Sequence, residues 1–322
     1  MNAANSAIHD DEIADFRARL RDSDPAVRRI AVLDLIDVAG DEHAPLLVEA
    51  LADSSAEVRL EATRALEAFE SPASMDGIVG LLTDEDIEVR EAAAHALSEL
   101  KHQDSAPLLL KHATDERPFV RVAILRGLRE LKVPDSFRPA LDSLAFPDPL
   151  VRREAVAVLG YLKDTRAIAA LMRLAENDSE AEVRRAATGA LGFAQHEDVL
   201  PALLAALNDG AWQVREEAAT TVGKLKLLSA LDELIAALND SYWQVRLRAA
   251  RSLGRLKDRR AVHPLIATLA HEISNLRKES ALALGEIGDS AALPALQLAE
   301  QDADPEVRKS VRLALEQIRA AE

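Results

Sequence analysis

Apolar residues recur along this chain with a short period that predicts helices. In the stretch 182–194 they stand three or four residues apart, beginning with Val183 and Ala187, so they lie on one stripe of an α-helix. A second stretch of helical spacing, 166–176, precedes it across a polar break at 177–180. The pattern therefore predicts a unit of two helices, A and B, joined by a short turn.

The same unit returns with a constant period along almost the whole chain. A Val-Arg pair marks the start of each predicted helix B, and successive pairs are equally spaced except for the step from Val151 to Val183, which is one residue longer. A two-helix unit cannot bury its stripe alone, whereas stacked neighbours bury it together. The repetition therefore predicts an all-α solenoid of about ten 31-residue repeats. The ten pairs begin at Val27, Val58, Val89, Val120, Val151, Val183, Val214, Val245, Leu276 and Val307.

The length of 322 residues does not require two domains, because the core of a solenoid grows along one axis. We expect a flexible N-terminal tail, 1–9, and one solenoid domain, 10–322. No apolar run approaches the roughly 18 residues that a membrane span needs, and the N-terminus lacks a signal-peptide pattern. With no cysteine in the chain, these features favour a cytoplasmic protein.

The residues around the Val-Arg pair carry a family resemblance. The pattern Asp-x4-Val-Arg-x2-Ala-x3-Leu-Gly resembles the HEAT repeat, in the short form named after phycobilisome (PBS) lyase subunits, over about residues 11–320. The resemblance implies a right-handed superhelix with the A helices on its convex face and the B helices on its concave face. It also implies a ladder in which a loop Asp meets Arg side chains of adjacent repeats.

Eight units have the acidic residue that such a ladder needs. Phe146 and His271 occupy its position in repeats 5 and 9, which leaves the ladder open there. Elsewhere we expect a structural role, in which paired charges also satisfy helix-end amides. Six residues before the arginines Arg28, Arg59, Arg90, Arg121, Arg184, Arg215, Arg246 and Arg308 stand Asp22, Asp53, Asp84, Asp115, Asp178, Asp209, Asp240 and Asp302.

The net charge of −16 argues against binding to nucleic acid or to an anionic membrane, which requires a basic surface. On the outward positions of the B helices, eleven basic residues nearly balance ten acidic ones. The acidic excess therefore lies on the A helices, the loops and the ends.

Candidate partner-binding residues gather in repeats 5 to 8. Aromatic residues and arginines are typical anchors of protein interfaces. We expect the two aromatics at equivalent B-helix positions to lie side by side, and the two tryptophans to stack one repeat apart. Each residue also has a structural alternative, since rings can fill gaps between helices and glutamates can neutralise arginines. The candidates on the concave face and the repeat edge are Arg153, Tyr161, Arg185, Phe193, Trp212, Trp243, Arg248, Arg251 and Arg255.

The chain lacks the common motifs of catalysis and metal binding. It has no Gly-rich phosphate loop, no Gly-x-Ser-x-Gly, no His-Glu-x-x-His, and no pair of histidines at helical ligand spacing. Deoxyhypusine hydroxylase, a similar architecture, carries His-Glu pairs after the Val-Arg position, where this chain has pairs such as Arg153-Glu154. HEAT-like DNA glycosylases need a basic groove. We therefore expect no catalytic residue, metal or cofactor.

These observations favour a non-enzymatic scaffold, adaptor or chaperone that holds a protein partner on its concave B-helix face. We expect a monomer, and the preference for Arg over Lys hints at a bacterial source. The alternative is a bilin lyase-type or cofactor-maturation subunit, because the lyase subunits share this type of repeat. Repeat type indicates fold and not chemistry, so the sequence leaves this alternative open.

Overall fold

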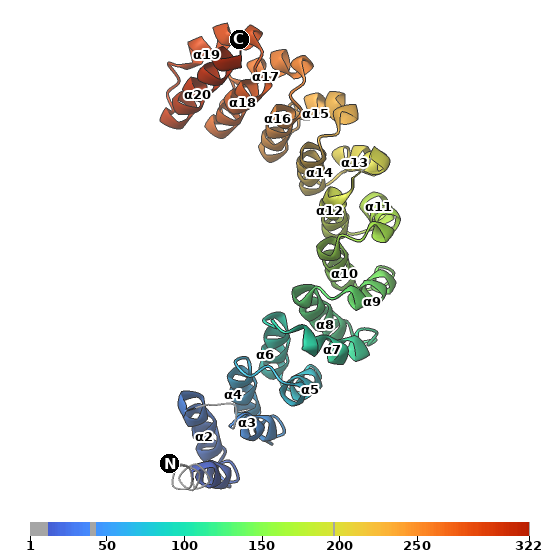
Figure 1. Ribbon diagram of the computed structural model, residues 1–322, viewed down its shortest axis with the longest axis vertical. Helices are drawn as coiled ribbons and strands as arrows, with labels where there is room; N and C mark the ends of the chain where they lie inside the picture. Colours follow the sequence, from blue (N-terminus) through green and yellow to red (C-terminus); the bar gives the residue numbers. More distant parts are fainter. Residues whose placement is uncertain (1–11, 39–42, 196, 322) are drawn as a thin grey trace. The chain divides into compact units, whose positions relative to one another are not determined.

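The computed structural model describes residues 12–38, 43–195 and 197–321, and the predicted tail, 1–9, lies outside them. The described part is helical and contains no strand. The chain forms two compact units, Met1–Leu162 and Lys163–Glu322. Figure 1 shows paired helices in each unit. The prediction of an all-α solenoid of two-helix repeats is confirmed.

In the first unit, a helix at 12–19 is helix A of the first repeat. Each later helix A packs on the helix B of its own repeat, and neighbouring B helices pack on each other. The A helices are α3 (Ala44–Ala50), α5 (Pro72–Leu81), α7 (Ala106–His112) and α9 (Phe137–Ser143). The B helices are α2 (Pro25–Val38), α4 (Ala56–Leu66), α6 (Ile87–Ser98), α8 (Pro118–Leu131) and α10 (Pro149–Leu162).

The second unit has the same two layers, with the B helices in one row and the A helices behind them (Figure 1). The A helices are α11 (Ile168–Asn177), α13 (Leu200–Leu207), α15 (Leu231–Ala237), α17 (Val262–Thr268) and α19 (Leu293–Ala299). The B helices are α12 (Ala181–Ala190), α14 (Trp212–Leu225), α16 (Trp243–Leu256), α18 (Ser274–Ile287) and α20 (Pro305–Ala321).

Single 3-10 turns lie where one repeat passes to the next. Most precede helix A, and η4 follows α12 in place of the last turn of a longer helix B. The turns are η1 (Gln103–Ser105), η2 (Pro134–Ser136), η3 (Thr165–Ala167), η4 (Leu191–Phe193), η5 (Glu197–Val199), η6 (Leu228–Ala230), η7 (Arg259–Ala261) and η8 (Ser290–Ala292).

The apolar stripe predicted for helix B forms the core between the two layers. In repeat 6, Val183, Ala187 and Leu191 are each at most 1% exposed. Burial of a Val or Leu side chain contributes about 1.5–3 kcal/mol each. Because every repeat supplies the same stripe, this contribution accumulates along the stack rather than in one central core.

The one longer step of the repeat, between Val151 and Val183, is absorbed in helix A of repeat 6. Helix α11 has ten residues, whereas α15, α17 and α19 have seven. The extra residue thus lies before Asp178, as the sequence predicts, and it extends a helix instead of bulging a loop.

Three glycines at equivalent positions of successive repeats allow close approach of neighbouring B helices in the second unit. A Cβ atom added at Gly254 would lie 2.8 Å from Ala283 Cα, a backbone atom of α18. Added Cβ atoms at Gly223 and Gly285 would come equally close to the backbones of α16 and α20, at 2.9 and 2.8 Å. Only a residue without a side chain fits these crossings.

We predict that Gly254→Ala lowers the free energy of unfolding by about 1–3 kcal/mol, because α16 and α18 must separate. The control is Gly80→Ala in α5, where an added Cβ meets nothing within 4 Å. That variant should gain roughly 0.5–1 kcal/mol from the higher helix propensity of alanine. Urea unfolding followed by circular dichroism tests both, and equal effects of the two variants would contradict the close-contact explanation.

Candidate functional site

Neighbouring repeats are joined at their A–B turns by a ladder of Arg–Asp pairs. In the second unit, Arg184 Nε and Nη2 donate to Asp209 Oδ2 and Oδ1 at 2.7 and 2.9 Å. Both side chains are largely buried, and the hydrogen bonds from Arg184 lower the pKa of Asp209. The same two-bond pairing, here called a rung, occurs in Arg28–Asp53, Arg59–Asp84, Arg184–Asp209, Arg215–Asp240 and Arg277–Asp302.

Each rung connects an arginine to the aspartate 25 residues further along, in the next repeat. Within one repeat, the arginine contacts only the backbone of its own turn, as when Arg215 Nη1 donates to the Asp209 carbonyl at 2.8 Å. Asp209 Oδ1 also accepts the backbone N–H of Ala211 at 2.8 Å. The aspartate therefore holds its own turn and the preceding repeat together.

In the first unit, an aromatic ring takes the place of one carboxylate. At Phe146, one of the two predicted departures, the Arg121 guanidinium lies 4.4 Å from the ring centroid, a cation–π contact. Asp115 is paired locally with Arg117, whose hydrogen bonds lower its pKa to about 2. Arg90 instead donates to the carbonyls of Asp84 and Glu85. The aspartate alone is therefore not sufficient for a rung.

The second departure, His271, leaves an arginine side chain incompletely paired. Arg246 Nη1 donates to the Asp240 carbonyl at 3.1 Å, as in the other repeats. Its Nε is buried and has no hydrogen-bond partner among the described residues, and the same is true of Gln244 Oε1. His271 reproduces the turn contact of an aspartate, because its Nδ1 accepts the N–H of Ile273 at 3.0 Å.

Exposed aromatic rings lie beside these rungs in the second unit. Trp212 stacks on Tyr242, with ring centroids 5.4 Å apart and an interplanar angle of 15°. The prediction that Trp212 stacks on Trp243 was therefore wrong, because the residue before Trp243 takes that place. Arg215 lies 5.7 Å from the Tyr242 ring centroid. We call Trp212, Tyr242 and Trp243 the aromatic edge.

The aromatic edge is open to solvent. Tyr242 is 45% exposed and Trp243 is 40% exposed, while Trp212 is half-buried. Tyr242 was not among the residues predicted from the sequence, although it differs from the residue at the same position of the other tryptophan-containing repeat. The first of these repeats has Ala211 at the position of Tyr242.

The candidate arginines of α16 contact glutamates of the adjacent B helices. Arg248 Nε donates to Glu216 Oε1 on α14 at 3.0 Å, and Arg251 Nε donates to Glu279 Oε2 on α18 at 3.0 Å. Arg255 is exposed and lines a small hollow together with Arg251. The structure thus brings the three arginines onto one face of α16 but pairs two of them within the chain.

The other candidates are divided between the two units. In the first unit, Arg153 contacts the buried Glu154 at 2.9 Å, and Tyr161 is 53% exposed with Lys132 Nζ 5.4 Å from its ring centroid. In the second unit, Arg185 contacts Glu182 on its own helix at 3.2 Å.

Phe193 lies in η4 and is half-buried, because α12 ends at Ala190. Its position is therefore on a 3-10 turn and not on the outer face of a long helix B, where sequence reasoning placed it. The alternative that this ring has a structural role is consistent with its partial burial.

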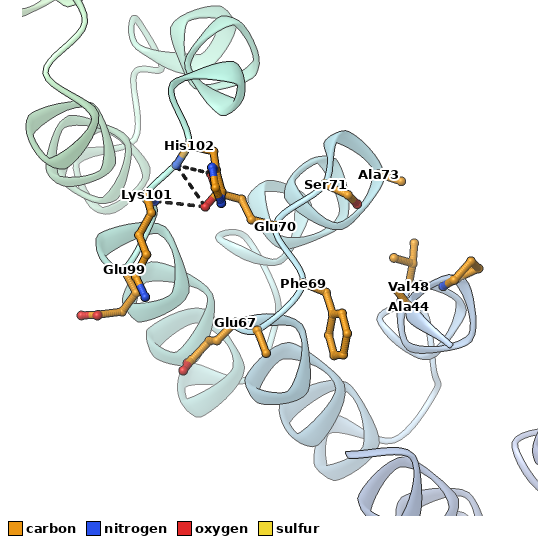
Figure 2. Close-up of a pocket in the computed structure, with 12 residues that line it drawn as sticks. Ala44, Val48, Glu67, Phe69, Glu70, Ser71, Ala73, Glu99, Lys101 and His102 are labelled. Carbon is orange, nitrogen blue, oxygen red and sulfur yellow. Dashed lines mark hydrogen bonds between the residues drawn. The ribbon is translucent and has the colours of Figure 1, made fainter. Parts of the chain in front are cut away.

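A hollow of 750 Å³ in the first unit was not predicted from the sequence. Figure 2 shows Phe69 and Val48 at one side of it and Glu99 at another. The Glu70 carboxylate accepts backbone N–H groups of Lys101 and His102 at 3.0 Å each. This carboxylate therefore caps the next turn and does not converge with other polar groups on a ligand position.

In the part of the chain that the structure describes, no group of three or more His, Cys, Asp or Glu residues could hold a metal ion. The helices there are also too short or too polar to cross a lipid bilayer.

Comparisons with known proteins agree with the repeat architecture. A family model described as HEAT repeats matches residues 13–84, 44–129, 75–145, 106–192, 137–223, 174–241 and 231–316. No curated protein sequence matched the chain.

Several solved structures have a similar fold. An engineered protein is 21% identical with a TM-score of 0.52, over 95% of this chain and 98% of its own. YibA of E. coli is 18% identical with a TM-score of 0.52, over 93% and 98%. Kap95p, in a structure that describes its binding to RanGDP, is 14% identical with a TM-score of 0.62, and the match covers 95% of this chain and 50% of that one. At these identities the likeness shows the fold alone.

We predict that Asp209→Asn lowers the free energy of unfolding by about 1–3 kcal/mol, because Arg184 loses a buried charged partner. An asparagine still accepts the Ala211 N–H, so the turn itself remains capped. The pKa of Asp209 is lowered in the folded state. Its stabilising contribution is therefore complete above the unfolded pKa of about 3.9 and is lost as the pH falls through the folded value.

Urea unfolding of the wild type and of Asp209→Asn from pH 7 to pH 2 measures this contribution. The difference between the two proteins should shrink as the pH falls below about 4. A difference that stays constant down to pH 2 would show that the ion pair does not contribute.

Proposed function

We propose that this chain, which belongs to the HEAT-repeat family, is a scaffold that binds a protein partner without catalysis of its own. The partner lies on the B-helix face and the aromatic edge of the second unit. The observation that carries this proposal is the exposure of Tyr242 and Trp243 in a chain that has only 3% aromatic residues. Rings of this size bury large apolar areas when a partner covers them.

The aromatic edge is preorganised for binding. Tyr242 stacks on Trp212 and lies near the guanidinium of Arg215, and Arg215 is itself fixed by its rung to Asp240. Side chains that are already ordered lose little conformational entropy on association, so more of their contact energy contributes to affinity. Large rings with few rotatable bonds are also the residues that dominate binding energies in interfaces.

The B-helix face supplies a polar surface beside these rings. Arg248 and Arg251 are oriented by Glu216 and Glu279, and Arg255 is exposed next to them. Arginines held in place by carboxylates can still donate their remaining N–H groups to a partner. We extend the proposed contact surface to Arg185 and Phe193 of the second unit. Arg153 and Tyr161 of the first unit are separate candidates for contact with a partner.

Kap95p provides support for the class of function. Its structure describes binding to RanGDP, so one HEAT-like solenoid of similar fold binds a protein. The net charge of −16 favours a protein over nucleic acid as the partner of this chain.

Capture of partners from the native host's lysate tests the proposal. We predict that the double variant Trp212→Ala, Trp243→Ala captures about tenfold less of a stoichiometric partner than the wild type does, because interface anchors of this kind contribute about 2 kcal/mol or more to binding. The control is Phe119→Ala, which removes a ring of similar exposure, 40%, in the first unit. Equal capture by the double variant and the wild type would place the partner elsewhere.

Exchanging the two charges of one ion pair on the B-helix face tests whether its arginine binds the partner or only stabilises the fold. We predict that Arg251→Glu with Glu279→Arg preserves the ion pair and the unfolding midpoint while reducing partner capture, because the positive charge moves from α16 to α18. Unchanged capture would remove Arg251 from the proposed surface. The visible absorption spectrum of the captured material tests the lyase-type alternative. A tetrapyrrole band would contradict the scaffold proposal and support a lyase-type function.

A further inference from the structure

We propose that the incomplete rung between repeats 8 and 9 is a binding position for a carboxylate side chain of the partner protein. Arg246 and His271 form this position, next to the aromatic edge. The inference rests on the proposed function, because it takes the carboxylate from the bound partner.

The complete rungs define what Arg246 can bind. Their arginines direct Nη1 to a carbonyl of their own turn, and Nε with Nη2 to both oxygens of a carboxylate, as Arg215 does with Asp240 at 2.6 and 2.9 Å. Arg246 Nη1 keeps the first contact, with the Asp240 carbonyl at 3.1 Å. Its guanidinium is therefore held as in a rung, with the two-bond side directed to the next repeat.

The described residues of the next repeat supply no acceptor for the Nε of that side. The residue 25 positions after Arg246 is His271, whose Nδ1 accepts the N–H of Ile273. A neutral histidine with Nδ1 as acceptor carries its proton on Nε2, so its other nitrogen is a donor. Arg246 Nε is buried without a partner among the described residues. Arg246 Nε therefore lacks the acceptor that completes the other rungs, and because this atom is buried, a carboxylate that binds it must displace the side chains that cover it.

A carboxylate fits this position better than a phosphate. All the rungs described above pair the guanidinium with a planar carboxylate, which matches its two parallel N–H groups. Arg246 contacts the backbone carbonyl of Asp240, and Glu272 follows His271 in the chain. The negative charges of these two acidic residues repel a dianion more than a monoanion.

The surroundings favour a peptide-borne carboxylate. Arg246 is half-buried, and Trp243 and Tyr242 precede it by three and four residues at the start of the same helix B. We therefore place an Asp or Glu side chain of the partner at this guanidinium and an apolar neighbour of that residue on the exposed rings. A partner of this surface must therefore carry both an apolar residue for the aromatic edge and an adjacent acidic residue for Arg246.

The arginine Nε–H signals in ¹H–¹⁵N NMR spectra of the full chain report directly on this position. The probes are acetyl-Asp-Leu-amide, its Asn counterpart, sodium acetate and inorganic phosphate. We expect the Asp probe to shift the Arg246 signal at concentrations where the Asn probe does not, and acetate to do so more weakly. The Arg215 signal, whose rung is complete, serves as the internal control. Equal responses to the Asp and Asn probes, or a stronger response to phosphate, would overturn the inference.

Two substitutions at one position provide matched variants. His271→Asp supplies the missing carboxylate from within the chain, so it should raise the unfolding midpoint, abolish the response to the Asp probe, and reduce partner capture about tenfold or more. His271→Asn still accepts the Ile273 N–H but brings no charge, so it should bind the probe and the partner as the wild type does.

The outcomes distinguish this inference from the proposed function. A partner that His271→Asp captures as well as the wild type does overturns the inference and leaves the scaffold function intact. A response of Arg246 to the Asp probe in a chain that captures no partner supports the carboxylate position and contradicts the scaffold function.

Discussion

The arrangement of this solenoid depends on the Arg–Asp rung between consecutive repeats. Apolar burial holds the helices together, but it is non-directional and tolerates small slips between similar stripes. A two-bond pair such as Arg184–Asp209 fixes the distance and orientation of one turn relative to the next. Because Asp209 also holds the N–H of Ala211, the same carboxylate sets the start of helix B in its own repeat. The exposed rings of Tyr242 and Trp243 therefore lie beside turns that these pairs fix.

Much of the fold follows from the sequence, because it depends on patterns that repeat. The spacing of Val183, Ala187 and Leu191 predicts both the helix and its buried face, and the structure confirms it. The position of the extra residue before Asp178 is also predictable, since the period itself reveals it. The single solenoid domain remains a prediction, because the period of the sequence does not show how strongly consecutive repeats pack on each other.

The candidate site was less predictable, because it depends on contacts between repeats. Whether Arg248 is free or paired is decided by Glu216, 32 residues away, and a one-dimensional charge count cannot reveal this contact. Stacking of Trp212 on Tyr242 and not on Trp243 depends on the exact rotation of helix B, which spacing fixes only approximately. The substitution at His271 was visible in the sequence, but its consequence for Arg246 requires the geometry of the complete rungs.

The constant separation of 25 residues within a rung bears on how such a chain changes its length. Every complete rung joins the end of one period to the beginning of the next. Within a run of repeats that carry complete rungs, a segment of one full period can thus be duplicated or deleted in register, and an arginine again meets an aspartate across the new junction. Gene rearrangements that preserve this period therefore yield chains with intact joints, so the number of repeats can evolve independently of the surface that each repeat presents.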